Sequence, residues 1–184
     1  MLESMTARLY LVRHAMPRVE PALASHEWCL DETGRAAAAE LARVMPSGSC
    51  LWSSSAEPKA HQTIESMAAC RGQSQIHIDA GFGEVARPNV FVRNHRQLAS
   101  QYVSGTRHRG WEDHDAVVSR FDSAVRASVR AAHGRDIVVA THGMAMTLWL
   151  SRYVDIGDPA LFWRGLALPD VFAVCPPAVT VAQT

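Results

Sequence analysis

The stretch Ile137-Val138-Val139-Ala140-Thr141-His142-Gly143 decides the expected fold of this chain. Its first four residues form a continuous apolar run, which is typical of a strand that is buried on both faces of a parallel sheet. A helical pattern follows from Gly143 to about Tyr153. We therefore expect a central strand that ends near a histidine and leads directly into a helix.

Strand and helix patterns alternate along the rest of the chain. Strands are expected at 9–12, 50–52, 76–78 and 171–174, and helices over 33–45, where Pro46 stops the first, 58–70 and 115–132. In the first of these helices, Ala37, Leu41 and Val44 are expected to share the buried face. Such alternation predicts an α/β fold, a three-layer sandwich with a mostly parallel central sheet.

The length of 184 residues suits a single domain that spans 1–184. Residues 86–112 are rich in Arg, His and Gly and lack a strong period, so we expect them to form a partly helical, lid-like insertion over an edge of the sheet. Arg87, Arg93, Arg96, Arg107, Arg109 and Trp111 belong to this segment. This basic and aromatic group could contact a second anionic part of a ligand, although a solvated face is the expected role of most of its members.

Composition excludes several classes of protein. Lys and Arg number 18 and Asp and Glu number 18, a balance that argues against nucleic acid or an anionic membrane as the main partner. No apolar run is long enough to span a bilayer, and the first residues lack the order of a secretory signal, so a cytoplasmic location is expected. Cys29, Cys50, Cys70 and Cys175 show no metal-binding or redox spacing; we expect free, mostly buried thiols and no metal site.

Histidines follow two of the expected strands. Arg13-His14 comes directly after the first strand, and Thr141-His142-Gly143 comes after the strand that opened this section. Ligands of open α/β sheets bind at the carboxyl ends of strands, and the N-terminus of the following helix offers free N–H groups to an anion. These positions predict a phosphate site that includes Arg13, His14, His142 and Gly143.

The same segments carry a resemblance to the histidine phosphatase superfamily, also called phosphoglycerate mutase-like. L-V-R-H-A-M-P resembles its Arg-His-Gly motif with Ala15 in place of glycine, and V-V-A-T-H-G-M-A-M resembles its late histidine motif. S-S-A-E-P-K-A-H-Q-T resembles S-S-P-L-x-R-A-x-Q-T, with Lys59 at the arginine position, and G-F-G-E-V-A-R-P places Glu84 at the acidic position. The resemblance covers about residues 8–154.

The resemblance implies a metal-independent phosphatase that needs no cofactor and forms a phosphohistidine on His14. Glu84 would act as general acid and base, and Arg13, Lys59, His142 and backbone N–H groups near Gly143 would stabilise the transferred phosphoryl group. Cations beside His14 would disfavour its imidazolium form and keep the ring nucleophilic. Lysine at position 59 retains the charge but loses the planar fork of arginine, so weaker positioning of phosphate is expected.

Three functions remain open at this point. The leading one is hydrolysis of a phosphomonoester, either a small phosphorylated metabolite or a phosphoprotein. A phosphoglycerate mutase-type transfer would use the same His14 chemistry in a pocket that excludes water, for which the chain is short. The third is a catalytically weak protein that binds phosphorylated ligands, with Lys59 as its first sign.

Overall fold

A five-stranded sheet forms the centre of the computed structural model, which describes residues 7–89 and 93–176. The strands are β1 (Leu9–Arg13), β2 (Cys50–Ser54), β3 (His77–Ile78), β4 (Asp136–Thr141) and β5 (Asp170–Val174), in the spatial order β3-β2-β4-β1-β5. The four strands β1, β2, β3 and β4 run parallel to one another, and β5 runs antiparallel to β1 at one edge. The predicted mostly parallel α/β sheet is confirmed.

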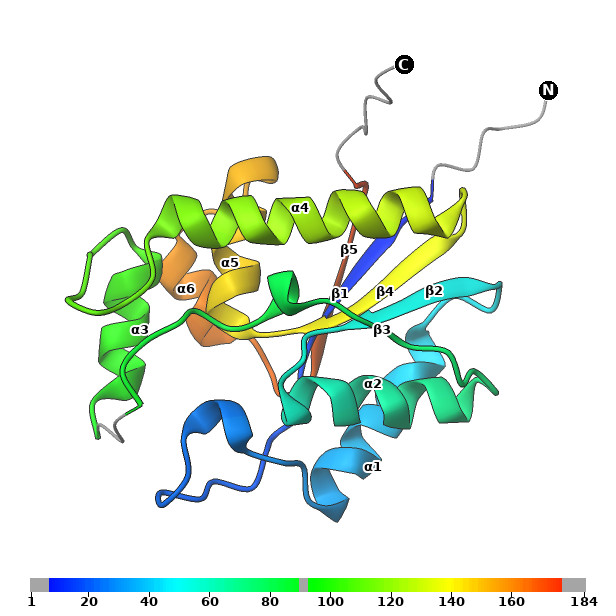
Figure 1. The fold of residues 1–184 in the computed structure, drawn as a ribbon, viewed down its shortest axis with the longest axis horizontal. Coiled ribbons are helices and arrows are strands. Elements are labelled where there is room, and N and C mark those ends of the chain that lie inside the picture. Colours follow the sequence, from blue (N-terminus) through cyan, green and yellow to red (C-terminus); the bar gives the residue numbers. More distant parts are fainter. Residues whose placement is uncertain (1–6, 90–92, 177–184) are drawn as a thin grey trace.

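Helices cover both faces of this sheet (Figure 1). They are α1 (Glu32–Leu41), α2 (Pro58–Cys70), α3 (His95–Val103), α4 (His114–Ala132), α5 (Gly143–Tyr153) and α6 (Pro159–Gly165), with the short 3-10 helices η1 (Ser25–Glu27), η2 (Ala42–Val44) and η3 (Ala80–Phe82). α1 and α2 lie on one face, and α4 and α5 lie on the other.

Strand β4 shows why both faces need cover. Ile137 and Val139 point into the core beneath α4 and α5, whereas Val138 and Ala140 point into the core beneath α1 and α2. All four side chains are fully buried. Because successive side chains of a strand alternate between faces, a continuous apolar run fits only a strand that is covered on both sides.

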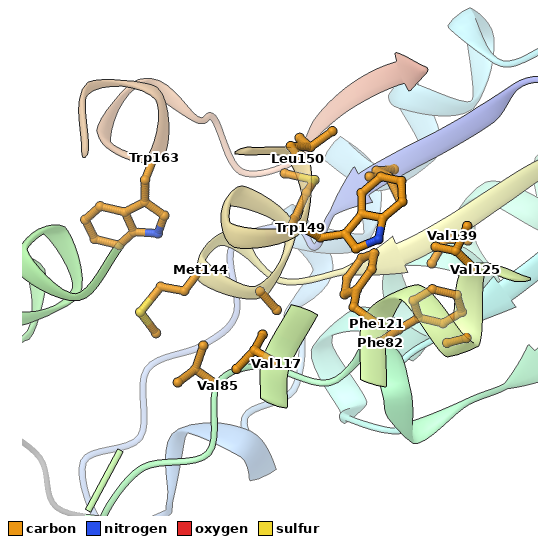
Figure 2. Close-up of a cluster of buried hydrophobic side chains, with 14 of the residues drawn as sticks. Phe82, Val85, Val117, Phe121, Val125, Val139, Met144, Trp149, Leu150 and Trp163 are labelled. Atoms are coloured by element: carbon orange, nitrogen blue, oxygen red, sulfur yellow. The ribbon is translucent and has the colours of Figure 1, made fainter. Parts of the chain in front are cut away.

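Aromatic packing fixes α4 against η3 and α5 (Figure 2). The ring of Phe121 in α4 meets that of Phe82 edge to face at 5.2 Å and lies 5.5 Å from the Trp149 ring in α5. Val117 and Val125 on the same face of α4 are also fully buried. The loop after η3 is thereby held near the start of α5, where the site residues lie.

The buried face of α1 differs from the expected one. Gly34 and Ala38 are its buried residues, and Val44 is 64% exposed, so the prediction that Val44 lies on the buried face was wrong. A Cβ at Gly34 would lie 2.5 Å from the Met16 carbonyl oxygen. Small residues let this helix approach the loop closely, and the α-helix ends at Leu41, before Val44.

One helix, α6, was not predicted, and α3 was expected only as part of a partly helical lid, without bounds. α3 falls inside the expected lid segment and presents Ala99, Tyr102 and Val103 to the core, an i, i+3, i+4 pattern hidden in a polar sequence. α6 begins at Pro159, and the Asp158 carboxylate accepts hydrogen bonds from the next free backbone amides, a sequence signal that could have found it. Residues 90–92 of the expected lid lie outside the described residues, and the lid itself stays a prediction.

The cysteines also differ from expectation. All four are free, but Cys50 is the buried one, whereas Cys29, Cys70 and Cys175 are exposed. The expectation of mostly buried thiols was therefore wrong, because three of them lie in loops or at the end of α2. Within residues 7–89 and 93–176, no helix combines the length and the apolar character needed to cross a bilayer.

Thr141, which ends β4, ties the loop after η3 to the sheet, because its hydroxyl donates to the Phe82 carbonyl at 2.7 Å. Thr141→Val should lower the free energy of unfolding by about 1–3 kcal/mol, since it leaves a buried carbonyl without its donor. Thr147→Val is the matched control. That buried hydroxyl donates within its own helix to Gly143 O, so its loss should cost less. Equal costs in urea unfolding of the two variants would contradict this role of Thr141.

Candidate active site

The carboxyl ends of β1, β2 and β4 meet at one edge of the sheet. The His14 backbone N–H donates to Thr141 O at 3.0 Å, and the Ser55 N–H donates to Ala140 O, also at 3.0 Å. The rings of His14 and His142 lie 5.1 Å apart between centroids. The structure thus brings together the two histidines that the sequence placed at separate strand ends.

His14 is 8% exposed and lies at the wall of a cavity. Its Nδ1 lies 2.8 Å from the Ala15 carbonyl oxygen. Because a carbonyl can only accept, Nδ1 carries the proton, and the lone pair of the neutral ring is on Nε2. Burial, then His142 and Lys59, lower the pKa of His14 well below its usual 6.5, so the ring is neutral at neutral pH.

His142 is fully buried behind His14. Its Nε2 lies 2.9 Å from Ser55 Oγ and 3.3 Å from Glu57 Oε1, while its buried Nδ1 has no partner among the described residues. Burial and then the cation of Lys59 lower the pKa of His142 well below 6.5. This histidine therefore faces protein acceptors in the free chain.

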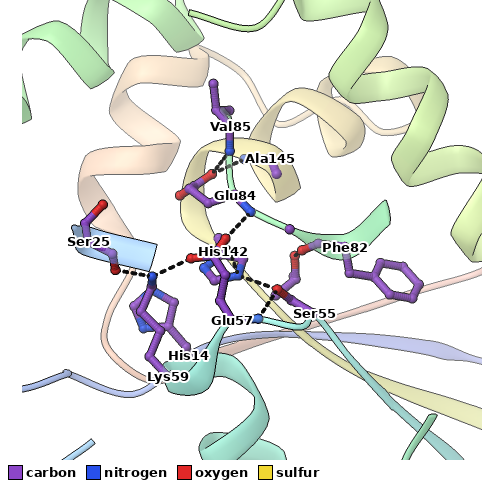
Figure 3. A network of polar contacts seen from close by, with 12 residues as sticks. His14, Ser25, Ser55, Glu57, Lys59, Phe82, Glu84, Val85, His142 and Ala145 are labelled. Atoms are coloured by element: carbon purple, nitrogen blue, oxygen red, sulfur yellow. Dashed lines mark hydrogen bonds and ion pairs between the residues drawn. The ribbon is translucent and has the colours of Figure 1, made fainter. Parts of the chain in front are cut away.

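Glu84 follows η3 and is partly buried above the histidines (Figure 3). Its carboxylate accepts hydrogen bonds from the backbone N–H groups of Val85 at 3.0 Å, Ala145 at 3.0 Å and Met144 at 3.3 Å. Two of these amides are at the start of α5, where the sequence led us to expect free donors for phosphate near Gly143. In the free chain, the Glu84 carboxylate takes them.

The charge state of Glu84 follows from its surroundings. Burial alone would raise its pKa, but the interactions with His142, with the Arg87 cation and with the Val85 N–H outweigh it, so the pKa is lowered. Glu84 is a carboxylate in the free protein at neutral pH. A role as general acid would thus require that a bound anion raise this pKa.

Lys59 is buried, with a side chain that is 7% exposed, in the first turn of α2. Its Nζ donates to Ser25 O at 2.7 Å and to Glu57 Oε2 at 2.5 Å. Lys59 is therefore not a solvated surface lysine, and its ammonium already has two protein partners.

Glu57 is the site residue that sequence reasoning missed. It is the N-cap residue of α2 and yet makes no side-chain cap, because its carboxylate points into the site (Figure 3). Its position two residues before Lys59, where the resembling motif has leucine, is the signal that could have found it. Its Oε1 also accepts from the Glu84 N–H at 2.8 Å.

Arg13 comes directly before His14 and lines the same cavity. Its Nη1 donates to Leu166 O at 2.8 Å, and its buried Nε has no hydrogen-bond partner within the described residues. Gly143 lies against it: an added Cβ would lie 3.0 Å from Trp163 Nε1 and 3.1 Å from Arg13 Nε. Glycine at 143 therefore allows this close approach of α5 to the arginine.

The cavity at this edge has a volume of about 330 Å³. Its inner wall holds Arg13, His14, Lys59 and Glu84, and its outer wall holds apolar side chains and further basic groups, among them Trp28, Arg87, His95, Arg96, Trp163 and Arg164. Of the basic group noted in the sequence, Arg87 and Arg96 line this cavity. Arg107 pairs instead with Asp113, and Arg93 and Arg109 are exposed and do not line it.

In the described part of the chain, no group of three or more His, Cys, Asp or Glu side chains is arranged to hold a metal ion. The groups that do converge are two neutral imidazoles, two carboxylates and the cations of Arg13 and Lys59. Such a set can donate hydrogen bonds to a tetrahedral anion and can move protons.

Comparisons with solved structures agree with this fold. A mycobacterial glucosyl-3-phosphoglycerate phosphatase, solved in complex with VO3, is similar with a TM-score of 0.70 and 18% identity over 91% of this chain and 92% of that chain. A phosphoglycerate mutase from Bacillus anthracis is similar with a TM-score of 0.67 and 16% identity, covering 91% and 86%. The protein YhfR of Bacillus stearothermophilus gives a TM-score of 0.67 and 19% identity, covering 84% and 83%. No curated protein sequence matches the chain.

The fold and its edge of paired histidines define an α/β protein of the phosphoglycerate mutase-like type. The family model of the histidine phosphatase superfamily, branch 1, matches residues 9–171. The chain belongs to this superfamily.

The depressed pKa values of the two buried histidines can be tested directly. In an NMR titration of the free protein, the ring resonances of His14 and His142 should still be those of neutral imidazole at pH 6.5, because burial disfavours the charged form. His14→Asn and His142→Asn assign the signals. In the urea-unfolded chain, the same rings should titrate with a pKa of about 6.5. Titration of either folded ring at or above that value would contradict the derived electrostatics.

Proposed function

We propose that this protein is a phosphatase that hydrolyses a phosphomonoester through a phosphohistidine on His14. The observation that carries the proposal is the neutral His14 ring, with its free Nε2 lone pair at a cavity wall beside Arg13, Lys59 and Glu84. A neutral imidazole is the form that can attack phosphorus. Cations next to the ring stabilise the charge that develops on the phosphoryl oxygens.

In the first step, His14 Nε2 attacks phosphorus in line with the ester oxygen, the P–O bond breaks, and the leaving alkoxide takes a proton. Glu84 is the proposed source of that proton. Its pKa is low in the free protein, but a phosphate dianion in the cavity opposes the carboxylate charge and raises it. Binding of substrate would therefore load Glu84 with the proton that the leaving group needs.

In the second step, the Glu84 carboxylate accepts a proton from water as the water oxygen attacks the phosphorus of the phosphohistidine; the P–N bond breaks, and inorganic phosphate and the neutral His14 ring are released. Arg13, Lys59, His142 and the amides at Gly143 are the proposed stabilising donors. His142 and the first amides of α5 contact Glu57 and Glu84 in the free chain, so these groups would exchange protein acceptors for phosphoryl oxygens.

A small phosphorylated metabolite is the proposed substrate. The cavity of about 330 Å³ lies at the small end of ligand pockets, which favours a compact molecule over a phosphoprotein segment. The similar phosphatase acts, by its name, on glucosyl-3-phosphoglycerate, and the similar mutase on phosphoglycerate. Transfer to a second hydroxyl instead of water is the competing function.

Rapid quench of the protein with p-nitrophenyl phosphate should trap an acid-labile, base-stable phosphoenzyme. His14→Ala should trap none and should lose turnover, because the nucleophile is gone. A variant that kept full activity would overturn the proposal, and a wild-type protein that binds phosphate without turnover would be a binding protein. Product analysis with 3-phosphoglycerate separates the two transfer reactions: free phosphate indicates a phosphatase, and 2-phosphoglycerate indicates a mutase.

Glu84→Gln should slow turnover of an alkyl phosphate by roughly 10²- to 10⁴-fold, the usual contribution of general acid–base help. With p-nitrophenyl phosphate, whose leaving group needs no proton, the first step should suffer much less than the hydrolysis of the intermediate. Phosphoenzyme should therefore accumulate in this variant. Glu65→Gln, an exposed carboxylate on α2, is the matched control. Equal loss in both steps would argue against proton transfer by Glu84.

A further inference from the structure

The inner part of the cavity carries almost no net charge. Arg13 and Lys59 supply two cations, and the Glu84 carboxylate lines the cavity with them. The Glu57 carboxylate lines the neighbouring cavity, which shares Glu84, and pairs with Lys59 from there. Both histidines are neutral at neutral pH. A phosphate dianion that enters here meets as many fixed negative charges as positive ones, so the inner site by itself attracts it weakly.

Glu57 also occupies the donors that a phosphate would use. Its Oε2 accepts from Lys59 Nζ, and its Oε1 accepts from the Glu84 N–H at 2.8 Å and lies 3.3 Å from His142 Nε2. These three donors come from α2, from the loop after η3 and from the end of β4. One internal carboxylate is thus bound as an external anion would be, with 16% of its side chain exposed.

The outer part of the cavity is different, because the guanidinium groups there bond to uncharged oxygens of the described residues. Arg87 donates to Val85 O and Ser25 Oγ, Arg96 donates to Arg164 O, and Arg164 donates to Ser100 Oγ. Across residues 7–89 and 93–176, none of the three guanidinium groups forms an ion pair. Their charge is therefore available to a ligand.

The outer cations lie close to the reacting groups. Arg87 lowers the pKa of Glu84, and Arg96 is near enough to Arg13 to act on its pKa. Arg87 also lines a smaller cavity of about 180 Å³ that shares Ser25, Trp28 and His95 with the main one. A compact ligand with its phosphate at His14 can therefore place a second group among these arginines.

We propose that Glu57 competes with the scissile phosphate for Lys59 and His142, so that productive binding depends on a second anionic group of the substrate held by Arg87, Arg96 and Arg164. The inference rests on the proposed function and names its substrate class: compact phosphomonoesters whose leaving group carries a carboxylate or another phosphoryl group. A guanidinium fork binds either of these groups with two parallel hydrogen bonds. The affinity for substrate thus comes largely from the anionic group on the leaving group. Competition by Glu57 weakens the binding of substrates that lack this second charge.

Glycerol 3-phosphate and 3-phosphoglycerate form a matched pair, because they differ mainly in a hydroxymethyl group against a carboxylate. The wild-type kcat/KM should favour 3-phosphoglycerate by roughly 10- to 100-fold, the range for charge-assisted hydrogen bonds. The preference should fall as salt rises, because these guanidinium groups are exposed or partly exposed. A ratio near one, or faster hydrolysis of a phosphopeptide, would overturn the proposal.

Two kinds of substitution should reduce this preference by opposite routes. Glu57→Gln should lower KM for glycerol 3-phosphate about tenfold, with a smaller effect on 3-phosphoglycerate, because Lys59 and His142 are released. Arg96→Gln and Arg164→Gln should instead raise KM for 3-phosphoglycerate about tenfold. Glu65→Gln and Arg130→Gln, which remove the same charges from exposed positions of α2 and α4, should leave the ratio as it is.

The change in KM caused by Glu57→Gln distinguishes competition with phosphate from a merely structural role of Glu57. If Glu57 served to hold Lys59 in place, its loss would raise KM for both substrates, and the proposal would fail. In a Lys59→Met background, the gain from Glu57→Gln should shrink, since the competed donor is absent. Equal gains in the two backgrounds would also refute it.

Binding without turnover makes the test independent of the proposed reaction. Calorimetry should show tighter binding of 3-phosphonopropionate than of propylphosphonate, which lacks the carboxylate, and the difference should shrink in Arg96→Gln. A protein that forms phosphohistidine but binds both equally retains the proposed function and loses this inference. If the protein forms no phosphohistidine but still binds 3-phosphonopropionate more tightly, the proposed function fails and the proposed selectivity is retained.

Discussion

The parallel pairing of β4 between β1 and β2 is the constraint on which the site depends. It brings the carboxyl ends of three strands to one edge, so that His14 and His142, far apart in sequence, come within 5.1 Å. Thr141 adds a hydrogen bond that holds the loop of Glu84 over the same edge. The backbone hydrogen bonds of the sheet, which are short-range and directional, thus position the reacting groups.

Within that frame, electrostatics decide what each side chain can do. The two imidazoles are neutral because they are buried beside cations, and Glu84 is ionised because its interactions with His142, Arg87 and a backbone amide outweigh its burial. Glu57 and Glu84 take donors that an incoming anion would need. Carboxylates of the protein therefore already occupy the hydrogen-bond donors of the site, and selectivity depends on how well a ligand replaces these carboxylates.

Much of the fold could be predicted from local pattern. α2 and α5 agree with the expected 58–70 and 143–153, because their apolar periods and start signals are strong. α6 was missed because a seven-residue length gives a weak periodic signal, and the bounds of α3 within the partly helical lid were not predicted because its sequence is mostly polar. The buried face of α1 was misjudged because it packs through Gly34 and Ala38 rather than through its larger residues.

The sequence by itself determined the parallel sheet, the order of the motifs and the candidate residues, because apolar alternation and strand-end chemistry are local properties. It showed Lys59 as a cation but not the ion pair that Lys59 forms, and its one sign of Glu57 was an acidic residue where the resembling motif has leucine. The tertiary structure alone decided that the Glu57 carboxylate meets Lys59 and His142 and that Arg164 faces the cavity beside Arg96. Charge cancellation depends on distances through space, which no one-dimensional pattern records.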